Sequence, residues 1–408
     1  MWAEAWRSRF DGHTVLLGVT GSIAAYKACE LASRLVEAGA EVYPAMTRSA
    51  RQLLGPATLE ALCGRRVRSE LFEPESTWEI DHIAIARRIH LALIAPATAN
   101  IIAKAAHGIA DDWLSTTLLA TWAPVVMAPA MNADMYSHPA TSHNLDILRE
   151  RGVYMAGPAV GRQACGTEGP GRLAEPAEIL MVAARAIRHP GDLRGKHVLI
   201  SAGGNREPLD PVRFVGNASS GRMGWALAFA AWTRGASVTV ILGTCDIPPP
   251  PLVNVIPAAT ALAMRDAVLE NLPKCDIFIS AAAVADYRPD SPQPAKRKRS
   301  GASWTVTLVP NPDILLEACQ HRRPGQILVG FAAETEDTLV RGMEKRCNKG
   351  ADLLVANTVG GEHGAIGSDN ADAWIIGPGD TVTPMPNAGK LTIADRLLDC
   401  CVALTHGT

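Results

Sequence analysis

The sequence predicts an α/β protein of two domains, each built on a parallel sheet with helices on both faces. Short apolar runs alternate along the whole chain with segments whose apolar residues recur at helical spacing. The runs are apolar almost throughout, which is typical of strands buried on both faces of a parallel sheet. A chain of 408 residues is also too long for one ordinary hydrophobic core. These three observations together predict two consecutive domains.

The elements follow one another in a regular order. In the first half we expect strands at residues 14–19, 41–45, 91–95 and 124–128, with helices at 24–38, 101–119 and 177–188. In the second half we expect strands at residues 197–201, 237–242, 276–280, 326–331 and 352–356, with helices at 223–234 and 259–271. The turn His189-Pro190-Gly191-Asp192 separates a helix from a new strand. It therefore places the boundary between domains at residues 1–190 and 191–408.

Two segments break this alternation. Residues 286–300 are rich in proline and basic residues, have no periodicity and predict a long exposed loop. The four prolines at 248–251 predict a stiff connection. Either segment can also be a plain linker. Residues 1–12 carry no motif, and the sequence gives them no role.

Composition excludes several classes of protein. The formal net charge of −2 gives no general attraction to nucleic acid. The nine cysteines are scattered and form no Cys-x-x-Cys pair, which argues against a disulfide framework or a zinc ribbon and favours a reducing compartment. The sequence identifies no metal ligands. No apolar stretch reaches the roughly 18 residues of a membrane helix, and no signal-peptide pattern is found, so we expect a cytoplasmic protein.

Small polar residues follow four strands of the first half. They are Gly21-Ser22-Ile23, Thr47-Arg48-Ser49, Ala97-Thr98-Ala99-Asn100 and Ala130-Met131-Asn132. Ligands of parallel sheets bind beyond the carboxyl ends of the strands, where helix N-termini attract phosphate. No Gly-x-Gly-x-x-Gly follows the first strand, so a mononucleotide fits better than a dinucleotide. Ser22 can alternatively be only the N-cap of the next helix.

Five motifs in this part of the chain resemble the flavin-dependent cysteine decarboxylases. GSIAAYK, IDHI, APATAN, PAMN and ACG-x-x-GxGRL occur in this order between residues 13 and 188. The resemblance implies a flavodoxin-like, doubly wound domain that binds FMN between neighbouring subunits of a trimer. Matched motif by motif, the residues implied to contact FMN are Gly21, Ser22, Ile23, Thr47, Ser49, Thr98, Ala99, Asn100 and Ala130.

The same resemblance implies three residues that act on the substrate. His82 would be the active-site histidine, Asn132 would hold the substrate carboxylate, and Cys165 would donate a proton from a mobile flap. An N-acylated cysteine has no carbonyl placed to accept the electrons that departing CO2 leaves behind. Oxidation of its CH2–SH group by a flavin creates a thioaldehyde, which accepts them, and an acid must later return a proton. Taken alone, His82 can be structural, Asn132 an Asx turn and Cys165 an inert thiol.

The second half contains a polar turn that leads into a helix. Residues 216–221 superficially resemble a P-loop, but Arg222 and Met223 stand where lysine and a hydroxyl residue are required, and no strand directly precedes the turn. We therefore reject a P-loop. The pattern still predicts a helix whose N-terminus favours an anion.

Residues 192–395 resemble the phosphopantothenate–cysteine ligase family. The motifs are AGG-x-REPLDPVR, N-x-SSG-x-MG, AAAVADY, NPDI, GFAAET and the region of Asn357. The resemblance implies a Rossmann-like domain that dimerises and activates a carboxylate with CTP. Asn217 would handle the acyl-cytidylate, and the implied CTP residues are Ser280, Ala281, Ala282, Asp286, Lys296, Asn311, Pro312, Asp313, Ile314, Phe331, Lys345 and Lys349.

Several alternatives remain open for the second half. Lys296 lies ten residues after Asp286, as in the family pattern, but the run 296–299 can also be a solvated charge cluster. Phe331 would be a core residue by default. Asn205 and Arg222 stand where the family pattern has threonine and lysine, which leaves the reaction class unchanged.

Together the two resemblances imply a bifunctional enzyme that acts on 4′-phosphopantothenate, cysteine and CTP. Mg²⁺ is expected with the triphosphate. Trimeric and dimeric contacts in one chain would close into a homo-oligomer as large as a dodecamer. The competing hypotheses are a different flavin enzyme with an unrelated appendage, or a nucleotide-binding module without catalysis.

Overall fold

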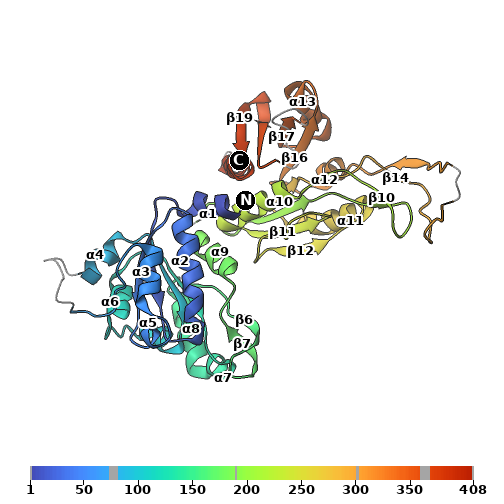
Figure 1. Ribbon diagram of the computed structural model, residues 1–408. Coiled ribbons are helices and arrows are strands. Elements are labelled where there is room, and N and C mark those ends of the chain that lie inside the picture. The colour runs from blue at the N-terminus through green and yellow to red at the C-terminus, as the bar shows by residue number, and fades with distance from the viewer. Residues whose placement is uncertain (1, 73–80, 189–190, 300–302, 359–367, 407–408) are drawn as a thin grey trace. The chain divides into compact units, whose positions relative to one another are not determined.

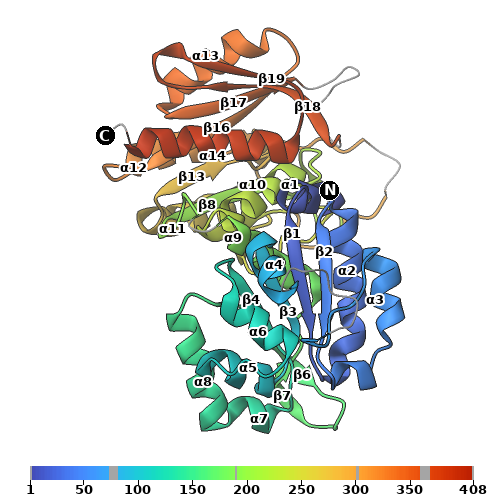
Figure 2. The ribbon, with the colours of Figure 1, turned by 90° about the vertical axis from the view of Figure 1, so that its left-hand side faces the viewer.

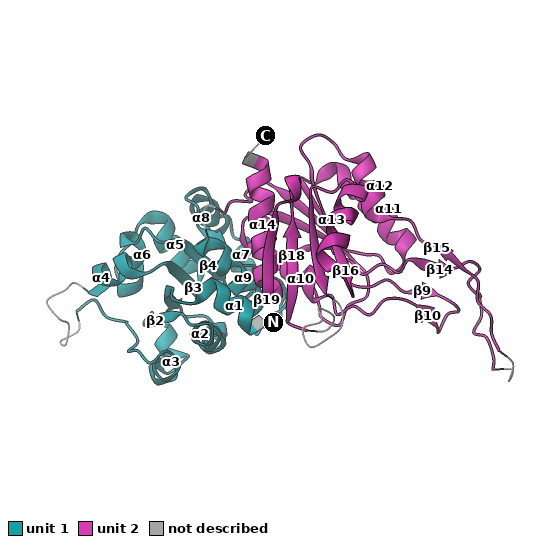
Figure 3. Cartoon of the chain, turned by 90° about the horizontal axis from the view of Figure 1, so that it is seen from above, with its two compact units in different colours: residues 1–190 teal, residues 191–408 magenta. Residues whose placement is uncertain are grey.

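The structure is a computed structural model that describes residues 2–72, 81–188, 191–299, 303–358 and 368–406 (Figures 1 and 2). The chain divides into two compact units, residues 1–190 and 191–408 (Figure 3). Each unit has its own central sheet and its own hydrophobic core. The α/β fold class predicted from the sequence is confirmed.

The sheet of the first unit has five parallel strands in the order β2-β1-β3-β4-β5. The central strand β1 is buried along its whole length, as expected for a strand covered on both faces. Its Val15 lies beside Val42 of β2 and Leu91 of β3. The strands are β1 Thr14–Val19, β2 Glu41–Met46, β3 Leu91–Ala97, β4 Val125–Pro129 and β5 Tyr154–Met155.

Helices cover both faces of this sheet. On one face α2 and α9 pack against the strands, and α4, α5, α6 and α8 contribute to the core on the other. The first helix packs on α2 and α9 through its buried Trp6 and Phe10, which gives the N-terminal segment a structural role. The helices are α1 Trp2–Phe10, α2 Ala28–Glu37, α3 Pro56–Cys63, α4 Asp81–Arg88, α5 Ala99–His107, α6 Trp113–Ala120, α7 Ala133–Ser137, α8 Pro139–Glu150 and α9 Pro176–Ile187, with 3₁₀ turns η1 Ile23–Lys27 and η2 Ala50–Gln52.

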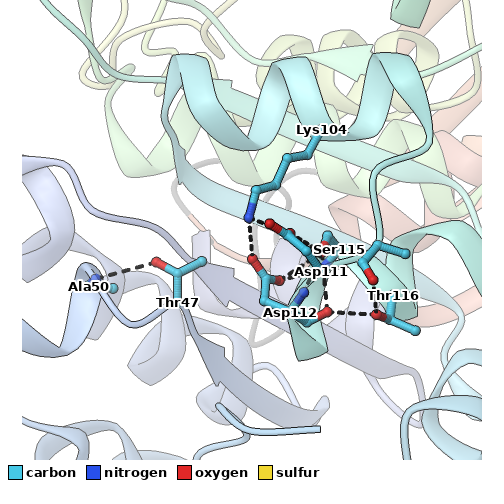
Figure 4. A network of polar contacts seen from close by, with 8 residues as sticks. Thr47, Ala50, Lys104, Asp111, Asp112, Ser115 and Thr116 are labelled. Carbon is cyan, nitrogen blue, oxygen red and sulfur yellow. Dashed lines mark hydrogen bonds and ion pairs between the residues drawn. The ribbon is translucent and has the colours of Figure 1, made fainter.

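The single helix predicted over residues 101–119 is wrong, because the structure has two helices there. Helix α5 ends at His107 and is followed by Gly108, which adopts a left-handed conformation with φ 69°. Asp112 then caps α6 by accepting a hydrogen bond from the Ser115 amide at 2.8 Å. Lys104 Nζ bridges Asp111 and Asp112 at 2.6 and 2.7 Å and fixes the corner between the helices (Figure 4). Apolar periodicity cannot reveal this break, since it continues through the corner.

Residues 159–172 form a β-hairpin, which the sequence predicted only as a flap. Strand β6 Ala159–Arg162 pairs antiparallel with β7 Glu168–Arg172, and Cys165 lies in the connecting turn. The four glycines at 161, 166, 169 and 171 have φ values of 153°, 88°, 157° and 124°. These values favour glycine, so the residues are needed for the shape of the hairpin.

The sheet of the second unit has eight strands in the order β12-β11-β8-β13-β16-β17-β18-β19. The first six pair in parallel, and five of them were predicted, whereas β12 was not. Strands β18 and β19 add an antiparallel edge that the sequence also did not predict. The strands are β8 His197–Ala202, β11 Ser237–Leu242, β12 Asn254–Pro257, β13 Ile277–Ser280, β16 Ile327–Glu334, β17 Leu353–Thr358, β18 Asn370–Ile376 and β19 Val382–Gly389.

Helices α10 and α14 pack on one face of this sheet and against each other, as Figure 2 shows. On the other face α11, α12 and α13 pack against β8, β16 and β17. The helices are α10 Arg222–Thr233, α11 Ala261–Asn271, α12 Ile314–His321, α13 Thr338–Lys349 and α14 Lys390–His406, with 3₁₀ turns η3 Leu272–Lys274 and η4 Pro378–Asp380.

Short strand pairs extend from one end of this sheet (Figure 3). Strand β9 Glu207–Pro208 pairs with β10 Phe214–Val215, and β14 Tyr287–Pro289 pairs with β15 Leu308–Pro310. The predicted loop over residues 286–300 is therefore wrong at its start, where β14 lies. Residues 290–299 are exposed and outside any strand, as expected.

Candidate active sites

The carboxyl ends of the strands in the first unit meet at one edge of the sheet. Thr20, directly after β1, donates its hydroxyl to the Pro96 carbonyl at 2.7 Å and accepts from the Thr98 amide at 3.0 Å. The Thr47 amide donates to the Val19 carbonyl at 3.0 Å. A Cβ added to Gly21 would lie 2.5 Å from Ser49 Cβ, so only glycine fits this close approach. The predicted flavin residues of three strand ends are thus brought together.

An open groove of ≈ 870 Å³ lies at this edge. Six of the nine predicted FMN residues line it: Gly21, Thr47, Ser49, Thr98, Ala99 and Asn100. Three do not. Ser22 caps η1 by accepting from the Ala24 amide at 3.4 Å, Ile23 is 68% exposed, and Ala130 is buried. The groove offers hydroxyl, amide and helix N-terminal groups, a donor set suited to a phosphate-bearing ligand.

The structure brings Asn132 and Cys165 into contact across 33 residues of sequence. Asn132 Nδ2 lies 3.2 Å from Cys165 Sγ and 3.3 Å from Thr167 Oγ1. The Asn132 carbonyl oxygen Oδ1 accepts from the Asp134 amide at 2.8 Å, so the Asx turn considered as an alternative also forms. Two of the three predicted decarboxylase residues therefore lie in one cluster.

Gln163 holds this cluster together, and the sequence did not identify it. Its Oε1 accepts from the Ala133 amide at 3.0 Å and from the Thr167 hydroxyl at 3.2 Å. Its Nε2 donates to the Pro170 carbonyl at 3.2 Å. One glutamine thus joins both strands of the hairpin to the turn that carries Asn132. No sequence signal distinguishes it, because these partners come together only in the fold.

The environment of Cys165 makes its thiol more acidic than usual. Hydrogen bonds from the Thr167 side chain and backbone, and then from Asn132, lower its pKa to about 7. Each donor stabilises the thiolate relative to the thiol. At neutral pH the group therefore interconverts readily between its two protonation states, as an acid catalyst must.

His82 lies in the first turn of α4. The side-chain hydrogen bonds described for Asn132 and Cys165 do not include His82. Its neighbour Asp81 is fixed by the Trp113 indole at 2.9 Å and by Arg68 at 3.5 Å. Trp113 itself lines the groove, so Asp81 links the start of α4 to the groove wall.

The second unit contains a cavity of ≈ 180 Å³ at the carboxyl ends of its parallel strands. Its walls come from the turn 218–221, the start of α10, residues 281–283 after β13, β16, β17, β18 and the start of α14. Three of the predicted CTP residues line it, namely Ala281, Ala282 and Phe331. Phe331 is therefore a cavity residue and not simply a core residue.

Other predicted ligase residues form a network next to this cavity. The Asn311 amide donates to the Asp286 carbonyl at 2.8 Å, and Asn311 Nδ2 donates to Ala285 at 2.8 Å. Asn217 Nδ2 donates to the Val284 carbonyl at 3.0 Å. The loop that follows Ser280 at the end of β13 is thus joined both to Asn217 and to the Asn311-Pro312-Asp313-Ile314 turn.

The three predicted lysines lie on two segments, Lys345 and Lys349 on α13 and Lys296 between β14 and β15. Lys345 on α13 pairs with Glu334 at 2.5 Å, and Lys349 pairs with Asp313 at 3.3 Å. Asp313 also caps α12 by accepting from the Leu316 amide at 3.1 Å. Lys296 is exposed on the extended segment between β14 and β15. The structure does not bring Lys296 into contact with the other two.

Comparisons with known proteins cover both units. The family model described as Flavoprotein matches residues 6–188, and the model described as DNA/pantothenate metabolism flavoprotein C-terminal domain matches residues 193–404. The coenzyme A biosynthesis bifunctional protein CoaBC of Vibrio vulnificus is 44% identical over 387 residues, which is 94% of this chain and 96% of that protein. The protein of the same name from Bacillus subtilis is 42% identical over 401 residues, 98% of each chain.

This chain belongs to the CoaBC family. The bifunctional family expected from the motifs is thereby confirmed. A solved structure of the C-terminal domain of a CoaBC protein has 30% identity and a TM-score of 0.46, and covers 53% of this chain and 100% of that one.

Asn205 and Arg222, which differ from the family pattern, both make polar contacts in this CoaBC chain. Buried Asn205 accepts from the Ala285 amide at 2.7 Å and donates to Glu207, so it supports the loop after β13. Arg222 lines the cavity and pairs with Asp369 at 2.8 Å. Lys390, at the start of α14, lines the same cavity and was not identified from the sequence. Finding it required the topology that returns the last helix to α10.

Within the described ranges of this CoaBC chain, no group of three or more His, Cys, Asp or Glu residues could hold a metal ion. All nine cysteines are free. None of the helices in the described part is long and apolar enough to span a bilayer.

Proposed function

We propose that the chain catalyses two consecutive steps of coenzyme A synthesis, a CTP-dependent ligation in residues 191–408 and an FMN-dependent decarboxylation in residues 1–190. The proposal starts from membership of the CoaBC family. The observation that carries it is the 3.2 Å contact between the Asn132 amide and the Cys165 thiol. This contact supports the decarboxylation, because the residue proposed to hold the substrate carboxylate lies beside a thiol whose pKa is lowered.

In the ligation, the carboxylate of 4′-phosphopantothenate attacks the α-phosphate of CTP and releases pyrophosphate. The amine of cysteine then attacks the acyl carbon and releases CMP. Asn217, tied to the loop after β13, would orient the acyl-cytidylate. Lys296, Lys345 and Lys349 would neutralise the phosphates, with Mg²⁺ bound to the triphosphate. Ser280, Asp286, Phe331 and the 311–314 turn would surround the nucleotide.

In the decarboxylation, FMN would lie in the groove at the strand ends. The flat ring system and its phosphate would occupy the groove of ≈ 870 Å³, whose lining includes the small residues Gly21, Thr98 and Ala99. Bound FMN would supply two-electron redox chemistry at the CH2–SH group of the substrate. Asn132 would hold the substrate carboxylate until CO2 leaves, and Cys165 would then protonate the remaining carbon.

Exposed apolar side chains support the proposed oligomer. Ile23 and Tyr26 beside the groove are 68% and 65% exposed, and Trp122 is 99% exposed. Exposed aromatic and branched residues are typical of surfaces that a partner covers. A neighbouring subunit that covers Ile23 would complete the flavin site and could supply His82. We also propose that the enzyme works in the cytoplasm, consistent with nine free cysteines.

A mass-spectrometric assay tests both activities together. Purified protein is given 4′-phosphopantothenate, cysteine and each nucleoside triphosphate in turn. CTP should support formation of the cysteine conjugate, which then loses CO2, and the protein should be yellow with flavin absorbance near about 450 nm. A folded protein that binds no flavin would contradict the decarboxylase, and absence of the conjugate with every nucleotide would contradict the ligase.

Lys296→Gln tests the exposed segment between β14 and β15. If Lys296 reaches the phosphates, the variant should form acyl-cytidylate roughly 10-fold or more slowly, because one charge-assisted contact is lost. Decarboxylation of supplied conjugate should stay at the wild-type rate. Arg299→Gln, in the same exposed run, is the matched control for a general charge effect. A wild-type ligation rate in Lys296→Gln would refute this role.

A further inference from the structure

The cavity of the second unit is lined mostly by small residues. Gly203, the turn 218–221 and residues 281–283 contribute glycine, alanine and serine to its walls. Arg222 and Lys390 are the two charged side chains among the described residues that line it, and both are cationic. A cavity that combines backbone amides with two cations has the chemistry of an anion site.

The backbone of α10 adds to the positive potential. Gly221 precedes the helix with φ 73°, and a Cβ there would approach Cys245 Cβ to 2.5 Å, so the turn requires glycine. Met223 and Gly224 in the first turn of this twelve-residue helix line the cavity. The amides of a first helical turn carry partial positive charge. The cavity therefore lies at the positive end of α10.

Lys390 reaches the cavity from α14, a segment far away in the sequence. Burial, and then the nearby Arg222 charge, lower the pKa of Lys390, and Asp369 only partly offsets them. Asp369 lies 2.8 Å from Arg222 and its side chain is 55% exposed. Two like charges held beside a helix N-terminus oppose each other, and an anion bound between them would relieve that repulsion.

We infer that this cavity binds a phosphate group of one ligase substrate, through Lys390, Arg222 and the first-turn amides of α10. The inference rests on the proposed ligase function and adds residues to its site. At ≈ 180 Å³ the cavity is smaller than the 300–1,000 Å³ typical of whole small-molecule sites, so it accommodates one end of a ligand. That end is either the triphosphate of CTP or the 4′-phosphate of the acid substrate, which share this chemistry.

Lys390→Gln tests the inference and separates the two sources. Pyrophosphate release is measured while CTP, 4′-phosphopantothenate and cysteine are varied one at a time. We expect KM to rise about 10-fold or more for one phosphate-bearing substrate, and to stay unchanged for cysteine, which bears no phosphate. A rise for CTP assigns the cavity to the triphosphate, and a rise for 4′-phosphopantothenate assigns it to the 4′-phosphate.

Further variants exclude a merely structural effect. Lys390→Arg should retain most of the affinity, and Arg222→Gln, on a different helix, should weaken the same substrate as Lys390→Gln. Exposed Lys274→Gln is the matched control and should change no KM. Unchanged KM values for both phosphate substrates in Lys390→Gln and Arg222→Gln would overturn the inference.

Equilibrium dialysis separates failure of this inference from failure of the proposed function. Labelled CTP and labelled 4′-phosphopantothenate are dialysed against wild type and Lys390→Gln without turnover. Weaker binding of one of them to the variant supports the cavity even if the wild type proves inactive as a ligase. If wild type and Lys390→Gln bind CTP equally well and also bind 4′-phosphopantothenate equally well, the cavity does not bind a substrate phosphate through Lys390, even if ligation occurs.

Discussion

The two units hold their reactive groups in different ways. In the first unit, Cys165 contacts two neutral hydrogen-bonding groups, the Thr167 hydroxyl at 3.0 Å and the Asn132 amide at 3.2 Å. In the second unit, the candidate phosphate-binding lysines Lys345 and Lys349 are already paired with Glu334 and Asp313. Neutral donors adjust the acidity of a thiol without fixing its charge, whereas carboxylates hold cations in place until a stronger anion displaces them. The difference agrees with the proton transfer proposed for the first unit and the phosphate binding proposed for the second.

The largest effect is expected from Cys165→Ser. A hydroxyl is a much weaker acid than this thiol, so decarboxylation should fall by about 10²–10⁴-fold while ligation continues. A product that has lost CO2 and two hydrogens should accumulate, because it cannot regain its proton. Mass spectrometry of the reaction mixture measures this product.

The exposed Cys347→Ser is the matched control and should leave both rates unchanged. If Cys165→Ser decarboxylates at the wild-type rate, Cys165 is not the proton donor. The contrast between the two units would then have no bearing on their chemistry.

A smaller effect, on pH dependence, is expected from Thr167→Val. Because Cys165 must be protonated to act as the acid, the decarboxylation rate should fall as pH rises through its pKa of about 7. Removing the Thr167 hydroxyl removes the largest contribution that stabilises the thiolate, so the pKa should rise and the falling limb should move to higher pH.

The pH–rate profile and the pH dependence of thiol alkylation both report this shift. Thr58→Val, at an exposed position of α3, should reproduce the wild-type profile. If the pH–rate profile and the alkylation curve of Thr167→Val coincide with those of the wild type, the Thr167 hydroxyl does not lower the pKa of the Cys165 thiol.

The smallest expected effect is the change in stability caused by Lys349→Gln. Its pair with Asp313 is partly exposed and spans 3.3 Å. Such pairs contribute roughly 0–1 kcal/mol, so the melting temperature should change by less than about 4 °C. If Lys349 binds CTP phosphates, the KM for CTP should nevertheless rise several-fold. A large loss of stability with an unchanged KM for CTP would show that the Lys349–Asp313 pair is structural. The contrast drawn between this pair and the neutral surroundings of Cys165 would then be weaker.

The sequence predicted the elements of the parallel sheets better than the contacts at the sites. Strand β1 has the predicted bounds, since a continuous apolar run between polar turns leaves few alternatives. The antiparallel strands β18 and β19 were missed, because they are neither continuously apolar nor part of a strand–helix alternation. The motifs identified Asn132 and Cys165 separately. Their contact, the bridging role of Gln163 and the return of Lys390 to α10 depend on tertiary structure, which local patterns do not contain.

The Lys104 corner between α5 and α6 has a consequence for how ionic strength affects flavin retention. Among the described residues that line the groove, Arg48 and Lys104 are basic, whereas Glu70, Asp111 and Asp112 are acidic, which gives two positive against three negative charges. Lys104 is neutralised by Asp111 and Asp112 (Figure 4). A phosphate bound there would be held mainly by uncharged N–H and O–H donors, whose strength depends little on added electrolyte. The yellow chromophore should therefore stay with the protein during chromatography in concentrated sodium chloride.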